Sequence, residues 1–138
     1  MVKDFLVGMH PEPTLKSEIA MTGLRVFTGL TMAFAHGIGK IPPSAEFVAG
    51  VSGLGFPMPE IAAWLASFAE FGGGIALALG LLTRPAAAMI AVTMTVAAFG
   101  VHAMDPFQKK EMALIYLALS LFFALRGSGR LSVDRYLK

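Results

Sequence analysis

The sequence contains no cysteine. The chain therefore cannot form a disulfide bond, carry out thiol redox chemistry or bind a metal through thiolates. Charge is also scarce, since only 14% of the residues are Asp, Glu, Lys or Arg, against about a quarter in an average soluble domain. No basic patch is interleaved with aromatic residues, so the sequence gives no reason to expect nucleic-acid binding.

Apolar residues dominate instead, at 56% of the chain. A soluble domain of 138 residues cannot bury that much apolar surface. The apolar residues also fall into four blocks, and a bilayer core of about 30 Å needs about 20 apolar residues per helix. They predict an all-α integral membrane four-helix bundle that forms a single domain over residues 1–138. The expected spans are about 19–41, 61–83, 85–104 and 111–126.

The alternative to this fold is a soluble bundle with buried helices. The blocks are apolar around most of a helix circumference rather than along one stripe, which favours the membrane interpretation. The apolar part of the last block is short for a span, so we expect Glu111 and Arg126 at its two membrane interfaces.

The basic residues predict the orientation in the membrane. With four spans, both termini share one side with the turn at Arg84, and seven Lys and Arg residues lie there. The opposite side carries Lys40, Lys109 and Lys110. Positive charge favours the cytoplasm, so the N and C termini are predicted to be cytoplasmic. The segment 1–16 lacks the pattern of a signal peptide and is expected to be interfacial or cytoplasmic.

The connections between the blocks differ in character. The segment 42–59 contains several prolines and glycines together with apolar residues, so it is expected either as a short interfacial helix or re-entrant loop, or as a plain external loop. The turn around Arg84 is too short for anything but an antiparallel pair of helices. Small residues at 72–74 and 86–88 indicate faces where helices pack closely.

Ionisable residues inside the predicted spans are the strongest functional signal, because such groups are costly at membrane depth. Arg25, His36 and Lys40 follow a helical spacing that places them on one stripe of the first span. Glu70 lies near the middle of the second span. In depth along the membrane normal, Glu70 falls between Arg25 and His36 and could reach either side chain. We predict a buried contact between Arg25 and Glu70, and His36 is the alternative partner.

Two further residues lie near the outer ends of the last two spans. His102 and Glu111 are expected beside His36 and Lys40, so that the four ring one opening above Glu70. The resulting pocket in the outer half of the bundle would be closed by three apolar side chains, Phe34, Phe99 and Phe107. The alternative is that His102 and Glu111 are ordinary interfacial residues.

The residues of this pocket fit some ligands better than others. A haem between the two histidines or a metal on His and Glu side chains has only weak support in the spacing, and no metal site is assigned. Four short helices leave little room for alternating access by a transporter. A quinone headgroup suits the residues best, because His and Lys can hydrogen-bond a carbonyl, Glu70 can relay a proton, and apolar walls accept an isoprenoid tail.

The motifs resemble those of the DoxX-like membrane proteins. The central run of that family is similar to residues 70–74 and 79–86, its first-helix pattern to Arg25, His36 and Lys40, and its ending to residues 127–134. The resemblance covers residues 17–137. It implies a multi-pass protein of a bacterial or archaeal cytoplasmic membrane, in a family that includes the small subunit of a thiosulfate:quinone oxidoreductase. It implies Arg25, His36, Lys40 and Glu70 as the family core.

These observations predict a membrane subunit of an oxidoreductase-type complex whose polar pocket binds quinone or a similar small redox molecule. Two alternatives remain: a non-catalytic accessory or assembly subunit of a larger membrane complex, and a transporter of a small solute or proton. The sequence leaves open whether the chain is an enzyme by itself. The expected partners are membrane lipids and either other protein subunits or further copies of the chain.

Overall fold

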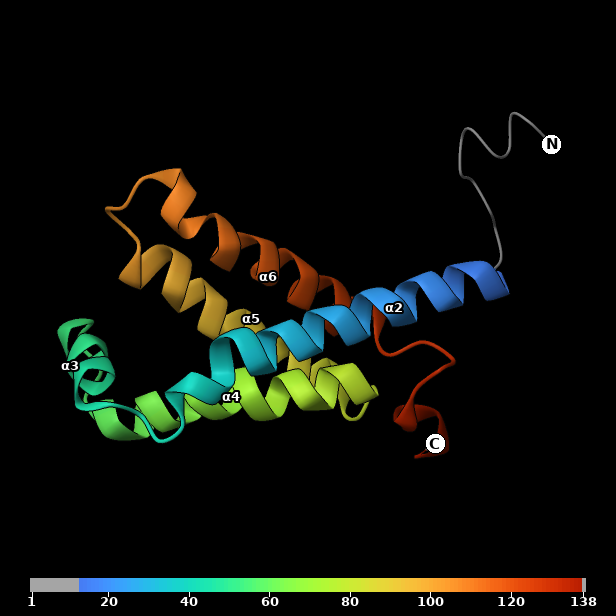
Figure 1. Ribbon diagram of the computed structural model, residues 1–138, viewed down its shortest axis with the longest axis horizontal. Helices are drawn as coiled ribbons and strands as arrows, with labels where there is room; N and C mark the ends of the chain where they lie inside the picture. The colour runs from blue at the N-terminus through green and yellow to red at the C-terminus, as the bar shows by residue number, and fades with distance from the viewer. Residues whose placement is uncertain (1–12, 138) are drawn as a thin grey trace.

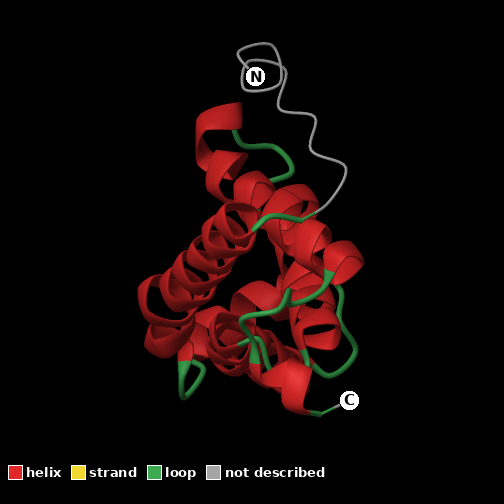
Figure 2. Cartoon of the chain, turned by 90° about the vertical axis from the view of Figure 1, so that its right-hand side faces the viewer, coloured by secondary structure: helices red, strands yellow, loops and turns green. Residues whose placement is uncertain are grey.

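The structure, a computed structural model, describes residues 13–137 and consists of helices joined by loops over that part of the chain (Figures 1 and 2). Its α-helices are α2 (Leu15–Thr31), α3 (Ala45–Gly53), α4 (Pro59–Leu79), α5 (Thr83–Val96) and α6 (Phe107–Arg126). The all-α prediction is confirmed. Most of the predicted cytoplasmic N-terminal segment, together with Lys138, lies outside the described residues.

Two of the long helices change their winding before they end. After α2 the chain continues as a π-helical stretch, Met32–Gly37, and a 3₁₀ turn, Ile38–Lys40. After α5 it continues as a second π-helical stretch, Ala97–Val101. A π turn bonds residue i to i+5 instead of i+4, so residues beyond it rotate away from the face that α-helical spacing predicts.

Within residues 13–137, two helical segments are long and apolar enough to cross a membrane, Pro59–Leu79 and Thr83–Val101. The first was predicted at 61–83, but α4 ends four residues earlier, because Gly80 adopts the left-handed conformation (φ 68°) that terminates helices. The apolar run continues through this turn, so hydropathy does not mark the end. The start of α6 also differs, since the helix begins at Phe107, four residues before the predicted 111. Its first turn is polar, so the start of the helix does not coincide with the start of the apolar block.

The helices pack in sequence order: α2 against α4, α4 against α5, and α5 against α6. At the α2–α4 crossing the two backbones touch. A Cβ added to Gly29 would lie 2.4 Å from the carbonyl oxygen of Gly74, and one added to Gly37 would lie 2.4 Å from the backbone nitrogen of Phe71. The prediction that small residues mark the packing faces is confirmed here. The buried core beside this contact includes Met32, Leu77, Ile90 and Phe123.

The connection between the first two long helices contains a helix, as one of its two interpretations expected. The hydroxyl of Ser44 caps α3 by accepting a hydrogen bond from the backbone N–H of Phe47 (3.1 Å). Val51 is buried, and α3 packs against α4. In Figure 1, α3 and the α5–α6 connection lie at one end of the molecule, and the C-terminal segment after α6 lies at the other.

Candidate functional site

A buried ion pair joins the first long helical segment to α4. The ammonium of Lys40 lies 2.7 Å from each carboxylate oxygen of Glu70. Glu70 is 1% exposed, whereas the Lys40 side chain is 35% exposed. The pair therefore combines a carboxylate inside the protein with an ammonium that reaches the surface.

The backbone of Lys40 is held by α4 as well. Ser67, three residues before Glu70, donates a hydrogen bond from Oγ to the carbonyl of Lys40 (2.9 Å) and lies 2.8 Å from the carbonyl of Ala63. The ring of Phe47 from α3 covers the ammonium, with its centroid 5.4 Å from Nζ, which adds a cation–π attraction. Lys40 is thus positioned by residues from two other helices.

The predicted contact between Arg25 and Glu70 is wrong. Arg25 donates instead to the backbone carbonyls of Ser128 and of Leu131 (2.8 Å for the latter). Its guanidinium carbon lies 2.9 Å from where a Cβ on Gly80 would be, and Gly80 is ten residues from Glu70, roughly 15 Å along a helix.

The physical reason is the direction of helical side chains. They lean toward the N-terminus of their own helix. Arg25 on α2 therefore reaches back toward the end where the C-terminal segment lies. Glu70 leans toward the N-terminus of α4, which is antiparallel to α2. Lys40 leans toward the start of its own helical segment, so the two side chains approach each other. The prediction compared only how deep each residue lies along the membrane normal, and depth does not say in which direction a side chain points.

His36 does not join the pair by a hydrogen bond or ion pair among the described residues. The π-helical stretch turns Gly37, rather than His36, against α4, where Gly37 meets the backbone at Glu70 and Phe71. His36 is half-buried and contacts the ring of Tyr116 on α6 edge-to-face, with the centroids 5.2 Å apart. Arg25 therefore lies on the buried face that the helical spacing predicts, whereas His36, in the π-helical stretch, is turned away from α4.

His102 and Glu111 lie at the α5–α6 connection. The Nδ1 atom of His102 is 2.8 Å from a carboxylate oxygen of Asp105. This hydrogen bond, helped by the charges of Lys109 and Lys110, lowers the pKa of Asp105 against a smaller rise from burial. Glu111 is exposed. Neither His102 nor Glu111 is hydrogen-bonded or ion-paired to Lys40 or Glu70 in the part of the chain that the structure describes.

The expected closure of an outer pocket by aromatic side chains is also wrong. Phe34, Phe99 and Phe107 are all more than half exposed, at 54%, 62% and 61%. Phe34 and Phe99 lie in the two π-helical stretches, which change the faces that these helix ends present, and Phe107 is the first residue of α6. Two pockets, of about 350 and 580 Å³, lie at the other end of the molecule, beside the C-terminal segment.

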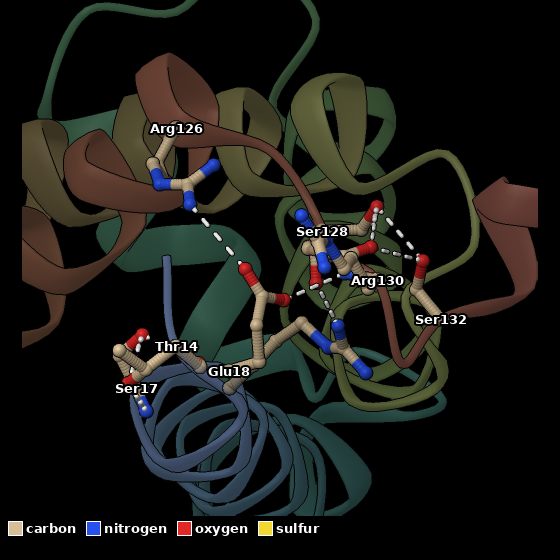
Figure 3. A network of polar contacts seen from close by, with 9 residues as sticks. Thr14, Ser17, Glu18, Arg126, Ser128, Arg130 and Ser132 are labelled. Atoms are coloured by element: carbon tan, nitrogen blue, oxygen red, sulfur yellow. Dashed lines mark hydrogen bonds and ion pairs between the residues drawn. The ribbon is translucent and has the colours of Figure 1, made fainter. Parts of the chain in front are cut away.

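Glu18 is a buried charged residue that the sequence reasoning missed. It is 4% exposed, accepts a hydrogen bond from the backbone N–H of Arg130 (2.8 Å) and pairs with Arg126 (3.7 Å). Figure 3 shows its carboxylate between Arg126, at the end of α6, and Arg130, in the segment that follows. An acidic residue at the edge of an apolar block was the available signal.

Asp134 was missed as well, and it caps a helix from a distance of about fifty residues. Its carboxylate accepts hydrogen bonds from the backbone N–H groups of Leu82 (2.6 Å) and Thr83 (3.0 Å) at the start of α5. Its own N–H donates to the carbonyl of Gly80 (2.8 Å). Burial raises the pKa of Asp134, but hydrogen bonds from Thr83 and Leu82 outweigh burial and lower it.

Arg25, Glu18 and Asp134 therefore fix residues 127–137 against the start of α2 and the α4–α5 turn. The described residues thus contain two polar centres, the Lys40–Glu70 pair and this C-terminal network.

The sequence profile of the DoxX family matches residues 20–103. The chain belongs to the DoxX family. The resemblance inferred from the sequence motifs is thereby confirmed, and the family is membrane-associated.

Two relatives show how far the similarity extends. A Bacillus subtilis protein named "Putative oxidoreductase CatD" is 30% identical over 120 residues, which cover 86% of this chain and 87% of the relative. An uncharacterized protein of Haemophilus influenzae is 33% identical over 111 residues, covering 75% of this chain and 80% of the relative. No solved structure matches the chain. The region that the DoxX profile matches contains Arg25, His36, Lys40, Glu70 and His102, whereas Glu18, Glu111 and the C-terminal segment 127–137 lie outside it.

Proposed function

We propose that this DoxX protein is the membrane subunit of an oxidoreductase-type complex, and that the Lys40–Glu70 pair binds quinone or a similar small redox molecule. Family membership and the name of the Bacillus relative support the oxidoreductase association. The ion pair supports the assignment of the site within the chain.

The proposal includes four membrane spans in a bacterial cytoplasmic membrane, with both termini inside. Two helical segments meet the length and hydropathy needed for a span, and α6 contributes 20 residues. Each long helix also exposes large apolar side chains, as expected of faces that contact lipid. Examples are Phe27 on α2, Leu65 on α4, Val92 on α5 and Leu125 on α6.

The observation that carries the site is the burial of Glu70 in the middle of an apolar helix. It is the twelfth residue of α4, so about 16 Å of helix precedes it. A carboxylate at this depth is costly and is by default a functional group. Lys40 stabilises its charge while remaining 35% exposed, so a ligand that approaches the ammonium is coupled to the carboxylate behind it.

This geometry suits a quinone carbonyl. An ammonium has three N–H donors, and its contacts with Glu70 use at most two of them, which leaves one for a ligand oxygen. Reduction of a quinone to a quinol takes up two electrons and two protons. Lys40 and Glu70 supply the proton path in this proposal, and His36, which precedes Lys40 by about one turn, is the second candidate donor. The electrons come from a redox centre on a partner subunit.

An accessory role without catalysis is the second candidate. Its support is that Glu70 is already satisfied by Lys40, as expected of a structural clasp between helices. Transport has less support. Between the ion pair and Arg25 the α2–α4 contact is made by the backbones of Gly29 and Gly74 with Ala33 and Ala78, which leaves no polar route along this interface.

The test uses Trp64, the single tryptophan of the chain. It lies six residues before Glu70 on α4, about 9 Å along the helix, and quinones quench indole fluorescence. Purified protein in nanodiscs is titrated with a short-chain ubiquinone and a menaquinone. The parent is expected to show saturable quenching above the linear background that quinone dissolved in lipid produces.

The variants separate the two candidate functions. Glu70→Gln and Lys40→Met are expected to weaken the saturable phase at least tenfold, whereas Glu46→Gln, at an exposed position of α3, leaves it unchanged. If the pair variants bind quinone like the parent but fail to co-purify with a partner, the accessory role replaces the redox site. Quenching that stays linear in the parent removes the quinone assignment.

A further inference from the structure

A pocket of about 580 Å³ lies where the α4–α5 turn meets the end of α6 and the C-terminal segment. Its lining includes Leu82, Arg84 and Pro85 from the turn and from the start of α5, and Arg126 and Leu137 from the end of the chain. It is separate from the Lys40–Glu70 pair, because neither residue of the pair lines it.

Two arginines, Arg84 and Arg126, line this pocket. Arg84 reaches back to the end of α6, since its Nε lies 3.5 Å from where a Cβ on Gly127 would be, and Gly127 directly follows Arg126. Arg126 is 47% exposed, and its 3.7 Å contact with Glu18 leaves most of its donors available. Arg84 makes no ion pair with any residue between 13 and 137.

The acidic residue in the pocket is Asp134, and its carboxylate is directed at α5. Both of its oxygens accept backbone N–H groups, from Leu82 and from Thr83. The negative charge is therefore engaged by the helix start. Two arginines that are open to solvent give the pocket an excess of positive charge, and arginine binds phosphate oxygens in a bidentate manner.

Two other lining residues are large, apolar and exposed. Leu82 is 60% exposed and Leu137 is 62% exposed. Apolar side chains beside a pair of arginines match an amphiphile whose headgroup is anionic. A free anion would gain nothing from these side chains.

We infer that this pocket binds the phosphate headgroup of an anionic phospholipid, with Arg84 and Arg126 on the phosphate and with Leu82 and Leu137 beside the acyl chains. The inference rests on the proposed topology, which places the pocket at the cytoplasmic interface where basic pockets bind such lipids. It does not rest on quinone binding.

The experiment measures lipid binding to the intact purified chain by native mass spectrometry and by the shift in melting temperature. Phosphatidylglycerol is titrated against phosphatidylcholine and, in a separate arm, against inorganic phosphate. The variant Arg84→Gln removes one guanidinium and breaks no hydrogen bond or ion pair found among residues 13–137. Lys109→Gln, at the opposite end of the molecule, is the matched loss of one positive charge.

The parent is expected to retain phosphatidylglycerol in preference to phosphatidylcholine. Arg84→Gln should weaken this binding about fivefold, and Lys109→Gln should leave it unchanged. An equal loss in both variants means general attraction to the surface and overturns the site. Competition by millimolar inorganic phosphate means a free-anion site and overturns the lipid assignment. Because quinone quenching at Trp64 is measured separately, failure here is distinguishable from failure of the proposed function.

Discussion

Lys40 and Glu70 form a salt bridge in which one ammonium contacts both oxygens of a buried carboxylate at 2.7 Å. The two residues come from the end of the first helical segment and the middle of α4. They meet because antiparallel helices direct their side chains toward each other at this level. Ser67 holds the backbone of Lys40 in the same place, so the geometry of the pair is set before any ligand arrives.

Breaking this pair from one side is expected to destabilise the protein more than removing both partners. Lys40→Met leaves the carboxylate of Glu70 buried without its counter-charge. Loss of one partner of a buried ion pair costs about 3–5 kcal/mol, and we expect about 2 kcal/mol because Lys40 is 35% exposed.

The measurement is unfolding of single and double variants in detergent micelles. The double variant Lys40→Met/Glu70→Gln should recover more than half of the loss caused by Lys40→Met. Lys109→Met provides the comparison for removing an exposed lysine. A double-variant loss equal to the sum of the losses in Lys40→Met and Glu70→Gln would show that the two residues are not coupled.

Hydropathy and spacing identified the helical class, the approximate positions of the long helices and both members of the ion pair. They paired Glu70 with the wrong cation because depth was used without side-chain direction. The π-helical stretch at Met32–Gly37 could not be anticipated, since it depends on the backbone contact of Gly37 with α4. The partners of Glu18 and Asp134 could not be predicted either, because both residues bind backbone groups of distant segments, which have no local sequence pattern.

The α2–α4 crossing is expected to depend on the absence of a side chain at Gly29. Gly29→Ala places a Cβ 2.4 Å from the carbonyl oxygen of Gly74 and 2.5 Å from the backbone nitrogen of Ala78, so the two helices must separate. We expect a loss of about 2 kcal/mol or more, in the range typical of overpacking.

Gly23→Ala is the matched control on the same helix. Nothing lies within 4 Å of its added Cβ, so the higher helix propensity of alanine should raise stability by up to about 1 kcal/mol. The two variants are compared by thermal unfolding in the same detergent. A Gly29→Ala protein as stable as the parent would mean that the helices do not touch at this point.

Arg25 is expected to hold the C-terminal segment rather than the ion pair. Arg25→Met removes the donors to the carbonyls of Ser128 and Leu131 and should detach residues 127–137. Trypsin cleavage at Arg130 and Arg135 is then expected to become at least tenfold faster. Quinone quenching at Trp64 should change little, because Lys40 and Glu70 are untouched. Slow cleavage together with lost quenching would instead place Arg25 in the redox site.

Asp134 is expected to make the docking of the C-terminal segment dependent on pH. Burial raises its pKa, but the hydrogen bonds from Thr83 and Leu82 outweigh this and lower it in the folded protein. A carboxylate with a lowered folded pKa stabilises the fold above its unfolded value of about 3.9, and this contribution disappears as the pH falls through the folded value. Asp134→Asn should therefore cost about 1 kcal/mol at pH 6.5, because the amide keeps only one acceptor oxygen for the two N–H groups and lacks the negative charge at the helix start, and progressively less below about pH 4. Melting temperatures of parent and variant at pH 6.5 and pH 3 measure the difference, with Glu46→Gln as an exposed acidic control. A stability gap of the same size at both pH values would show that the charge of Asp134 does not cap α5.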